Sequence, residues 1–456
     1  MPEPKILFNT STGSDTAASG AGPATALTGT GASLNSTTAV DLSADSPNLA
    51  GVATDGSACL WVDTTTGRQF AKITGVNNTT KVVTVALAYG VTATGRTWAI
   101  GGKRATLDAA SSRTLLSANG WRPGWECLLE TDQTITSTLS ISGPNVGNYA
   151  VFRSNTVGAS RKITCSANTT AIEWNSSGFS ELYIEDITIE NTNATKTSAN
   201  GISATGGGSA RLLTLNRCIL GHATNQLRIG LTTGGRLINS TVQHCTSFAV
   251  DCANSFSAYG SVFHSNANAV RINSGGNVFV RCLFYNQTNE NLLMNPTIPG
   301  NLVADCTFDN SSTDNFSTAF GSGGSAVMLV NCNLTKGGAF GIRTGQLSEL
   351  PVVRAESCNY GSGVDANTSG NFTTAGSVLE RNCVAVTPTY SNRATANYGP
   401  GSAIVGQGFP KSPATLGNGV SVAASSIDIG AIQSAGSGGS SGGLILSRPM
   451  NGGYAA

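Results

Sequence analysis

Three histidines recur at a near-constant spacing and could form one chemical group in the folded chain. His222, His244 and His264 are followed by Tyr285, each about one repeat length after the one before. A column of imidazoles could bind a metal ion or act as a base. The alternative, which we favour, is a stack of rings at one turn of a repeating structure.

Acidic side chains are the other candidates for chemistry. A glycan-cleaving site needs two carboxylates across a groove, or a carboxylate with a Lys or Arg base. The candidate catalytic residues are Glu185, Asp305 and Asp309. Glu185 and Asp186 are adjacent, so on one strand they should point to opposite faces. Asp309 is expected to cap a turn. We therefore favour surface or turn roles for these carboxylates.

The cysteines indicate which element positions these residues. A small residue, here called the marker, recurs in the same apolar setting at steps of 22, 21, 21, 24, 26, 26 and 25 residues. A period in this range is typical of stacked repeats. The residue two positions later is usually apolar, and the preceding residue suits a solvent face. The markers are Cys218, Ser240, Ser261, Cys282, Cys306, Cys332, Cys358 and Cys383.

Repeats of this length made only of strands and turns predict an all-β fold, a right-handed single-stranded parallel β-helix. Its coils should lie about 4.8 Å apart, with like residues stacked on like. Phe263, Phe284 and Phe308 would form an aromatic ladder inside it. Arg281 and Asp305 would be exposed neighbours on adjacent coils.

The marker cysteines would form a second interior ladder. Buried free cysteine behaves as a small hydrophobe, which is the role we favour. Disulfides between coils are an alternative that synthesis in a cytoplasm disfavours. A zinc site is a weaker alternative, because the chain has no pair of cysteines separated by two residues. No cofactor is expected.

Composition excludes several classes of protein. The 26 Lys and Arg residues nearly balance the 25 Asp and Glu residues, which gives a net charge of +1. A nucleic-acid groove needs clustered positive charge, so nucleic acid is not an expected partner. No apolar run is long enough to span a membrane, and the N-terminus lacks the apolar core of a secretory signal. Synthesis in a cytoplasm is therefore expected.

The chain divides into five predicted regions. Residues 1–106 are expected to form an extended arm and a small β domain, with strands near 57–63, 68–76, 81–90 and 96–102. Residues 107–125 should hold a helix that caps the first coil, and residues 126–433 the β-helix. A Gly/Ser linker follows at 434–443. Residues 444–456 are predicted to be a docking peptide, whose apolar residues are Leu444, Ile445, Leu446, Met450 and Tyr454.

The coil pattern, the preceding helix and the C-terminal motif resemble pectin-lyase-like right-handed β-helix proteins. The motif consists of Ser412-Pro413-Ala414 and Asp428-Ile429-Gly430-Ala431. The Thr/Ala/Gly-rich opening and the small β domain resemble bacteriophage virion proteins built on this fold. Such proteins serve as tail spikes, tail fibres or capsid decorations, and many of the spikes are trimers.

The resemblance implies a structural component of a bacteriophage virion, made in the host cytoplasm. It would be a rigid surface appendage or decoration attached to capsid or tail. Its expected partners are other virion proteins and further copies of itself, with a trimer favoured. The alternative is a tail spike that binds or depolymerises a host surface glycan, as a hydrolase or lyase.

Overall fold

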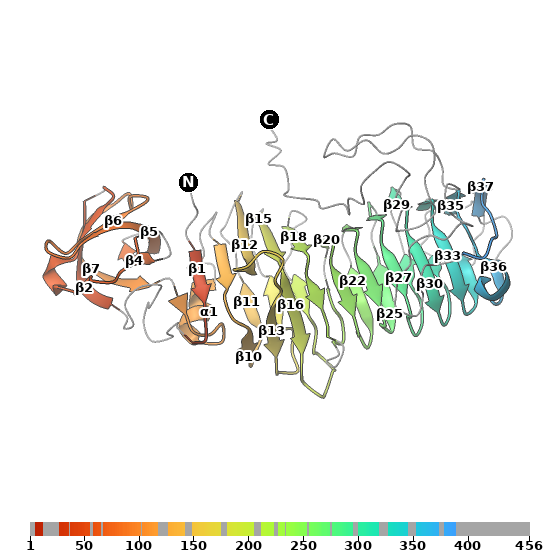
Figure 1. Cartoon of the computed structure of the whole chain (residues 1–456), viewed down its shortest axis with the longest axis horizontal. Helices are drawn as coiled ribbons and strands as arrows, with labels where there is room; N and C mark the ends of the chain where they lie inside the picture. The colour runs from red at the N-terminus through yellow and green to blue at the C-terminus, as the bar shows by residue number, and fades with distance from the viewer. Residues whose placement is uncertain are drawn as a thin grey trace.

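The computed structural model describes eighteen stretches of the chain. They are residues 5–11, 27–35, 37–54, 58–64, 67–101, 103–116, 126–141, 148–174, 180–204, 211–222, 227–232, 234–252, 255–273, 276–294, 300–318, 327–344, 353–373 and 378–388. Within them a small β-barrel precedes a long stack of strands, as Figure 1 shows. The predictions for residues 389–433, the linker at 434–443 and the docking peptide at 444–456 lie outside the described residues.

The stack is a right-handed parallel β-helix, as the repeat predicted. Each full coil contributes one strand to each of three walls, and every described pairing within the walls is parallel. Wall 1 has 13 strands. In spatial order they are β8 (Lys103–Arg104), β1 (Lys5–Phe8), β9 (Glu126–Leu129), β12 (Asn148–Ser154), β15 (Ser180–Glu185), β18 (Arg211–Asn216), β20 (Gly235–Ile238), β23 (Phe256–Tyr259), β26 (Val278–Val280), β29 (Asn301–Ala304), β32 (Val327–Val330), β35 (Val353–Glu356) and β37 (Val378–Arg381).

Walls 2 and 3 complete the coils. Wall 2 consists of β10 (Gln133–Ile135), β13 (Arg161–Cys165), β16 (Ile187–Asn191), β19 (Ile219–Leu220), β21 (Thr241–Gln243), β24 (Val262–His264), β27 (Leu283–Tyr285), β30 (Thr307–Ser311) and β33 (Asn333–Gly337). Wall 3 consists of β11 (Leu139–Ile141), β14 (Ile172–Trp174), β17 (Ile202–Ala204), β22 (Phe248–Cys252), β25 (Asn268–Ile272), β28 (Leu292–Met294), β31 (Phe316–Thr318), β34 (Phe340–Thr344) and β36 (Gly370–Phe372). Leu231 bridges β17 and β22, so wall 3 is continuous.

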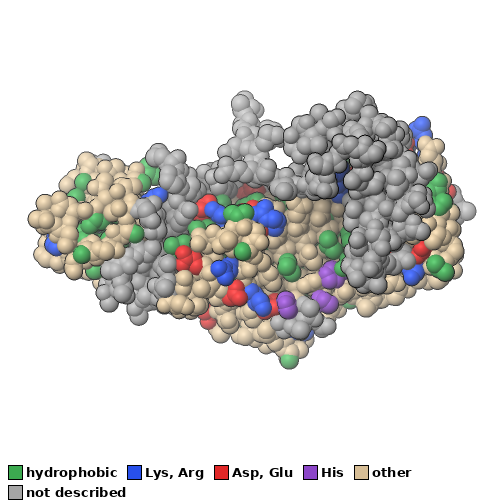
Figure 2. All heavy atoms as spheres, in the orientation of Figure 1, with side chains coloured by type: hydrophobic (Ala, Val, Ile, Leu, Met, Phe, Trp, Pro, Cys, Tyr) green, Lys and Arg blue, Asp and Glu red, His purple; other side chains and the backbone are tan. Residues whose placement is uncertain are grey.

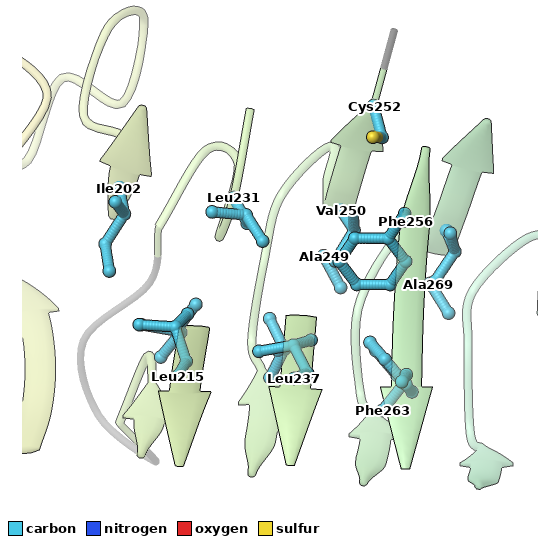
Figure 3. Packing of buried hydrophobic residues seen from close by; sticks show 14 of the residues in the cluster. Ile202, Leu215, Leu231, Leu237, Ala249, Val250, Cys252, Phe256, Phe263 and Ala269 are labelled. Carbon is cyan, nitrogen blue, oxygen red and sulfur yellow. The ribbon is translucent and has the colours of Figure 1, made fainter. Parts of the chain in front are cut away.

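One apolar core runs through all the coils. Side chains alternate along each strand, so one set faces the interior. Figure 3 shows Leu215 and Leu237 of wall 1 beside Ile202 and Leu231 of wall 3 in this core. The ring of Phe284 stacks on Phe263 at 4.7 Å and on Phe308 at 4.6 Å between centroids.

The corner between walls 1 and 2 is a single residue in the left-handed conformation. This residue directly precedes the marker in every coil from Arg217 to Asn382, with φ between 47° and 56°. The sequence places Asn, Asp or Gly at five of these eight corners, and those residues tolerate this conformation best. The residue before the marker was predicted to face solvent. That is wrong for Asp305, Asn331 and Ser357, which are buried.

The marker side chains bond the main chain at this corner. The Cys218 amide donates to Ser240 Oγ at 3.1 Å, the Ser240 amide to Ser261 Oγ at 3.2 Å, and the Cys282 amide to Cys306 Sγ at 3.4 Å. The marker is therefore small and also accepts a hydrogen bond. Packing as a small hydrophobe therefore accounts for only part of what the marker residue does.

At the other corners, buried Asn and Gln side chains accept hydrogen bonds from the backbone in the same way. The Cys245 amide donates to Asn266 Oδ1, and the Asn266 amide to Gln287 Oε1, both at 2.9 Å. On the return to wall 1, the Phe256 amide donates to Asn277 Oδ1 at 2.9 Å. Each corner thus carries a polar ladder that satisfies backbone groups which would otherwise be buried without partners.

The N-terminal region differs from its prediction in two places. A closed barrel forms from β2 (Leu27–Asn35), β3 (Ala39–Asp41), β6 (Val82–Val85), β5 (Gly67–Asn77), β4 (Cys59–Thr64) and β7 (Thr92–Gly101), and a short 3-10 turn lies at Ser43–Asp45. Two of its strands come from the stretch expected to be an arm. Strand β1 belongs to wall 1 of the β-helix, where it pairs with β8 and β9.

A short helix closes the first coil. Helix α1 (Ala110–Leu116) lies within the predicted 107–125 and packs near β11. Leu107 and Leu116 are buried in the β-helix core together with Phe8 of β1. Within the described residues no helix is long and apolar enough to cross a membrane. A second 3-10 turn, Gly363–Asp365, lies in the last coils.

Candidate functional site

One set of ionic and ring-bearing side chains lies at the corner of walls 1 and 2 and on the outer face of wall 2. Figure 2 shows acidic, basic and histidine side chains near one another on one side of the molecule. We call this set the polar track. It contains Glu185, Asp186, Arg217, Lys162, Glu190, His222, His244, His264 and Tyr285, and every sequence-predicted candidate for chemistry lies in it except Asp305 and Asp309.

Arg217 joins two carboxylates of the preceding coil. Its Nε and Nη2 atoms contact the two Asp186 carboxylate oxygens, both at 2.8 Å, and Nη2 also donates to Glu185 Oε1 at 2.8 Å. Glu185 ends β15 and Asp186 is the left-handed corner residue. The prediction that they point to opposite faces is therefore wrong, because the corner turns both toward the same guanidinium.

The surroundings of Asp186 favour its ionised form. Burial alone would raise the pKa of Asp186, but hydrogen bonds from Arg217 and from the Gly158 amide outweigh burial and hold the pKa below its ordinary value. Glu185 Oε1 also accepts from Asn216 Nδ2 at 2.8 Å and from Tyr183 Oη at 3.1 Å. Burial, together with the Glu185 charge, raises the pKa of Tyr183. Glu185 is thus held by three donors of its own chain, Arg217, Asn216 and Tyr183.

Glu190 is the buried centre of the next part of the track. Its Oε1 atom lies 3.1 Å from Lys162 Nζ and accepts from Thr164 Oγ1 at 3.0 Å. Its Oε2 atom lies 3.8 Å from His222 Nδ1. Glu190 is 3% exposed, whereas the Lys162 and His222 side chains reach solvent. The partners come from coils on both sides, so this carboxylate links three coils.

The other two histidines continue the track as stacked rings. His264 stacks on Tyr285 at 4.9 Å between centroids, and His244 meets His264 edge-on at 5.8 Å. Burial, and then the neighbouring His244, lower the pKa of His264 to about 4. Burial and His222 lower the pKa of His244. Both imidazoles are therefore neutral at pH 7.

Asp305 and Asp309 lie far from Glu185. Five strand spacings of wall 1 separate the coils of β15 and β29, which is about 24 Å at the usual spacing. Asp305 is buried and accepts from Asn331 Nδ2 at 3.1 Å. Asp309 is buried in β30 and accepts from Thr335 Oγ1 at 2.8 Å. Asp309 lies inside β30 and not at the turn where it was expected, and Asp305 is buried, so it cannot form the exposed pair expected with Arg281.

Sequence inspection missed one pair of coupled carboxyls. Glu290 and Asp314 occupy equivalent positions on adjacent coils, two residues before the paired Leu292 and Phe316. Burial raises the pKa of both groups, and the Asp314 charge raises that of Glu290 further. Arg343 Nη1 lies 3.2 Å from Asp314 Oδ2. The 24-residue spacing of the two acids is the signal that could have revealed this pair.

The described residues hold no cluster of three or more His, Cys, Asp or Glu side chains arranged to bind a metal. The marker cysteines are free thiols, and burial raises the pKa of Cys306 and Cys358. The geometry of the polar track supports ionic links between coils. It does not bring a pair of unengaged carboxylates together.

Comparison with known proteins gives a likeness at the level of fold. No family model matches the chain, and no curated protein matches it. One similar solved structure is the periplasmic alginate epimerase AlgG, at 12% identity and a TM-score of 0.31, covering 58% of this chain and 76% of that one. Another is a mannuronic acid specific polysaccharide family 6 lyase from human gut microbiota, at 12% identity and a TM-score of 0.31, covering 60% of this chain and 80% of that one.

Proposed function

We propose that the chain is a structural component of a bacteriophage virion, a rigid surface appendage or decoration attached to capsid or tail. The observation that supports this role is the use of charge between coils. Within the described residues, ion pairs join adjacent coils along the stack: Arg153–Glu126, Lys162–Glu190, Arg217–Glu185, Arg217–Asp186, Arg271–Asp251, Arg343–Asp314 and Arg381–Glu356. A β-helix whose successive coils are joined by ion pairs in this way resists bending and local opening.

The same pairing disfavours catalysis. General acid–base chemistry needs a group that can exchange a proton with substrate at its operating pH. Glu185 and Asp186 accept several hydrogen bonds from their own chain, and Asp305 and Asp309 are buried. The candidate catalytic carboxylates within the described residues therefore have structural roles.

Particles released from cells that carry this gene provide the test. We expect mass spectrometry of purified particles to find the chain in a fixed ratio to the major capsid protein. We expect cryo-electron microscopy to place a rod of stacked coils on the capsid or tail surface. Absence of the chain from intact particles would overturn the proposal.

Glycan binding is the second candidate, and one observation favours it. Gln243, His264 and Tyr285 occupy equivalent outward positions on three successive strands of wall 2. Such a row offers one hydrogen-bonding group per coil to a chain of sugar hydroxyls. Incubation of the purified protein with host surface polysaccharide tests it. Retention by the polysaccharide that His264→Ala abolishes, and Thr241→Ala does not, would support binding, and a new reducing end or unsaturated sugar would show cleavage.

A further inference from the structure

The outer face of wall 2 becomes buried toward the C-terminal end of the stack. Each strand of this wall has an inward residue, such as Phe308 of β30, and the residues on either side of it point outward. On β21 and β24 these outward residues are partly exposed. On β30 and β33 they are polar and yet buried. They are Thr307, Asp309, Asn333 and Thr335.

The corner of walls 1 and 2 shows the same change. Gly260 is exposed at this corner, whereas Asp305, Asn331 and Ser357 are buried at the equivalent positions of later coils. Asn382, on the last described coil, is exposed again. The earlier coils show that this sheet does not bury its own outward side chains. A layer of other atoms therefore has to cover the coils that begin at β30 and β33.

The buried side chains determine what this layer must offer. Thr, Asn and Asp side chains removed from water cost free energy unless they are hydrogen-bonded. Neighbouring coils supply some of the bonds: Asp309 accepts from Thr335 Oγ1 at 2.8 Å, and Asn359 Nδ2 donates to Asn333 Oδ1 at 2.8 Å. Two of the buried groups, Asp305 and Asp309, are carboxylates. The layer should therefore be polar and should bring positive charge.

The last described residues lead toward this face. Val384 pairs with Asn359, which continues the outward row of wall 2 beyond Asn333. The Val386 amide then donates to Asn359 Oδ1 at 2.9 Å. Pro388 is buried although it is the last residue that the structure describes. The chain thus passes residue 388 beside the outward row of wall 2.

The shorter stretches outside the described residues start elsewhere on the coils. On the same part of the stack they connect wall 3 to wall 1, at the corner opposite wall 2, and none is longer than eight residues: 295–299, 319–326, 345–352 and 374–377. Among the described elements, the strands packed against β30 are β27 and β33, which lie beside it in the same sheet. They are beside the outward residues and do not cover them.

We propose that residues 389–433 fold back over the outer face of wall 2 and cover the coils of β30 and β33. A further coil stacked on the end would cover only the last strand. Thr307 lies three strand spacings before Val384, which is about 14 Å at the usual spacing. A segment of this length spans on the order of 150 Å when extended, so its reach is ample.

The composition of the segment fits the surface that it covers. It is rich in Ser, Thr, Asn and Gly, whose side chains and accessible backbone offer hydrogen bonds without bulk. Its charged residues are Arg393, Lys411 and Asp428, so basic groups outnumber acidic ones. This sign is complementary to Asp305 and Asp309 on the buried face.

Cross-linking of the full chain tests the inference. Tyr285→Cys places a thiol on β27, in the outward row that continues to Asp309, and Gln243→Cys is the matched control in the same row. A benzophenone maleimide on each thiol is activated by light, and mass spectrometry identifies the joined peptides. We expect at least 10-fold more cross-linking to residues 389–433 from position 285 than from position 243. A mixture of isotopically labelled and unlabelled chains should show that the links lie within one chain.

Alkylation rates give a second measurement. Thr307→Cys and Thr241→Cys place thiols at equivalent outward positions of β30 and β21. In the full chain we expect N-ethylmaleimide to modify Thr241→Cys at least 100-fold faster than Thr307→Cys. Ending the chain at residue 388 should remove most of this difference. Circular dichroism establishes that each variant is folded, and cross-linking decides alone if the shortened chain does not fold.

Three results would overturn the inference. The first is that cross-links from position 285 do not form, or join only other parts of the chain or a second copy. The second is a folded full chain in which both engineered thiols react equally fast. The third is a folded shortened chain in which Thr307→Cys stays protected. None of these results bears on whether the chain is found in virions, so the proposed function is tested separately.

Discussion

Replacement of Cys306 by alanine or by serine distinguishes two physical roles for the marker position. If the marker were only a small apolar filler, alanine would be tolerated better than serine, because a buried hydroxyl costs free energy. In the structure, Cys306 Sγ accepts the Cys282 amide at 3.4 Å and lies 3.3 Å from the Ala304 carbonyl. Serine keeps both interactions, as Ser240 and Ser261 do in the same column.

The expected magnitudes follow from this geometry. Cys306→Ala leaves the buried Cys282 amide without its acceptor, which costs about 1–3 kcal/mol. Loss of the packed sulfur adds about 1 kcal/mol. The total is about 2–4 kcal/mol of unfolding free energy, against about 1 kcal/mol or less for Cys306→Ser, which conserves the bonding pattern.

Chemical denaturation and amide hydrogen exchange provide the measurement. We expect Cys306→Ala to speed exchange at the Cys282 amide, while Cys306→Ser leaves it slow. Cys127 is the matched control, because it is buried inside β9 with strands paired on both sides, and burial alone raises its pKa. At Cys127 serine should be worse than alanine. The reasoning is refuted if alanine is tolerated at Cys306 at least as well as serine.

Three further predictions concern other contacts between coils. Phe284→Ala should destabilise the fold by about 3–5 kcal/mol because the ring fills the core between two stacked phenylalanines, and a shift of the denaturation midpoint measures this; a change below 1 kcal/mol, on the order of a surface substitution, would contradict it. Arg217→Gln should lower the free energy of unfolding by about 2–3 kcal/mol, because it removes charged hydrogen bonds to Asp186. The lowered pKa of Asp186 means that ionised Asp186 stabilises the fold above its unfolded pKa and that this stabilisation is lost as pH falls. The difference in stability between variant and wild type should therefore be largest near pH 7 and shrink in acid. Asp314 and Glu290 have pKa values raised above 3.8 and 4.5, so their contribution to stability is present in acid and is lost as pH rises through the raised values. Asp314→Asn also removes the ion pair with Arg343, so we predict only the trend: the stability of this variant relative to wild type should increase between pH 4 and pH 7, and a difference that is independent of pH would contradict the raised pKa.

The periodic signals in the sequence were sufficient for the architecture. Small residues at the marker and apolar residues two positions later recur because each coil must repeat the same inward contacts. That repetition predicts the parallel β-helix, whereas the helix before the first coil is predicted from its own local sequence and from the need to cover the end of the stack. The barrel has more strands than the sequence predicts. Strand β2 has a Thr- and Gly-rich sequence that resembles an extended arm when its partner β7 is not known.

The site could not be predicted in the same way, because its contacts depend on backbone conformation at the corners. A strand model places Glu185 and Asp186 on opposite faces, whereas the left-handed φ of 55° at Asp186 turns it toward Arg217. The corner position is rich in Asn, Asp and Gly, which signals this left-handed conformation and not solvent exposure alone. The corner conformation does not determine the burial of Asp305, because Asn239 and Asn382 have the same conformation and are exposed.

The corner also explains why so many polar side chains gather between walls 1 and 2 in the described part of the chain. Where walls meet, the strand ladder is interrupted and backbone groups lose their usual partners. Cysteine, serine, asparagine and glutamine at these positions replace the missing bonds, one coil after another. Ionisable residues beside the corner bond to the coil above or below, as Arg217 does. In a fold built by stacking, the polar groups nearest a candidate site are thus the ones that hold successive coils together.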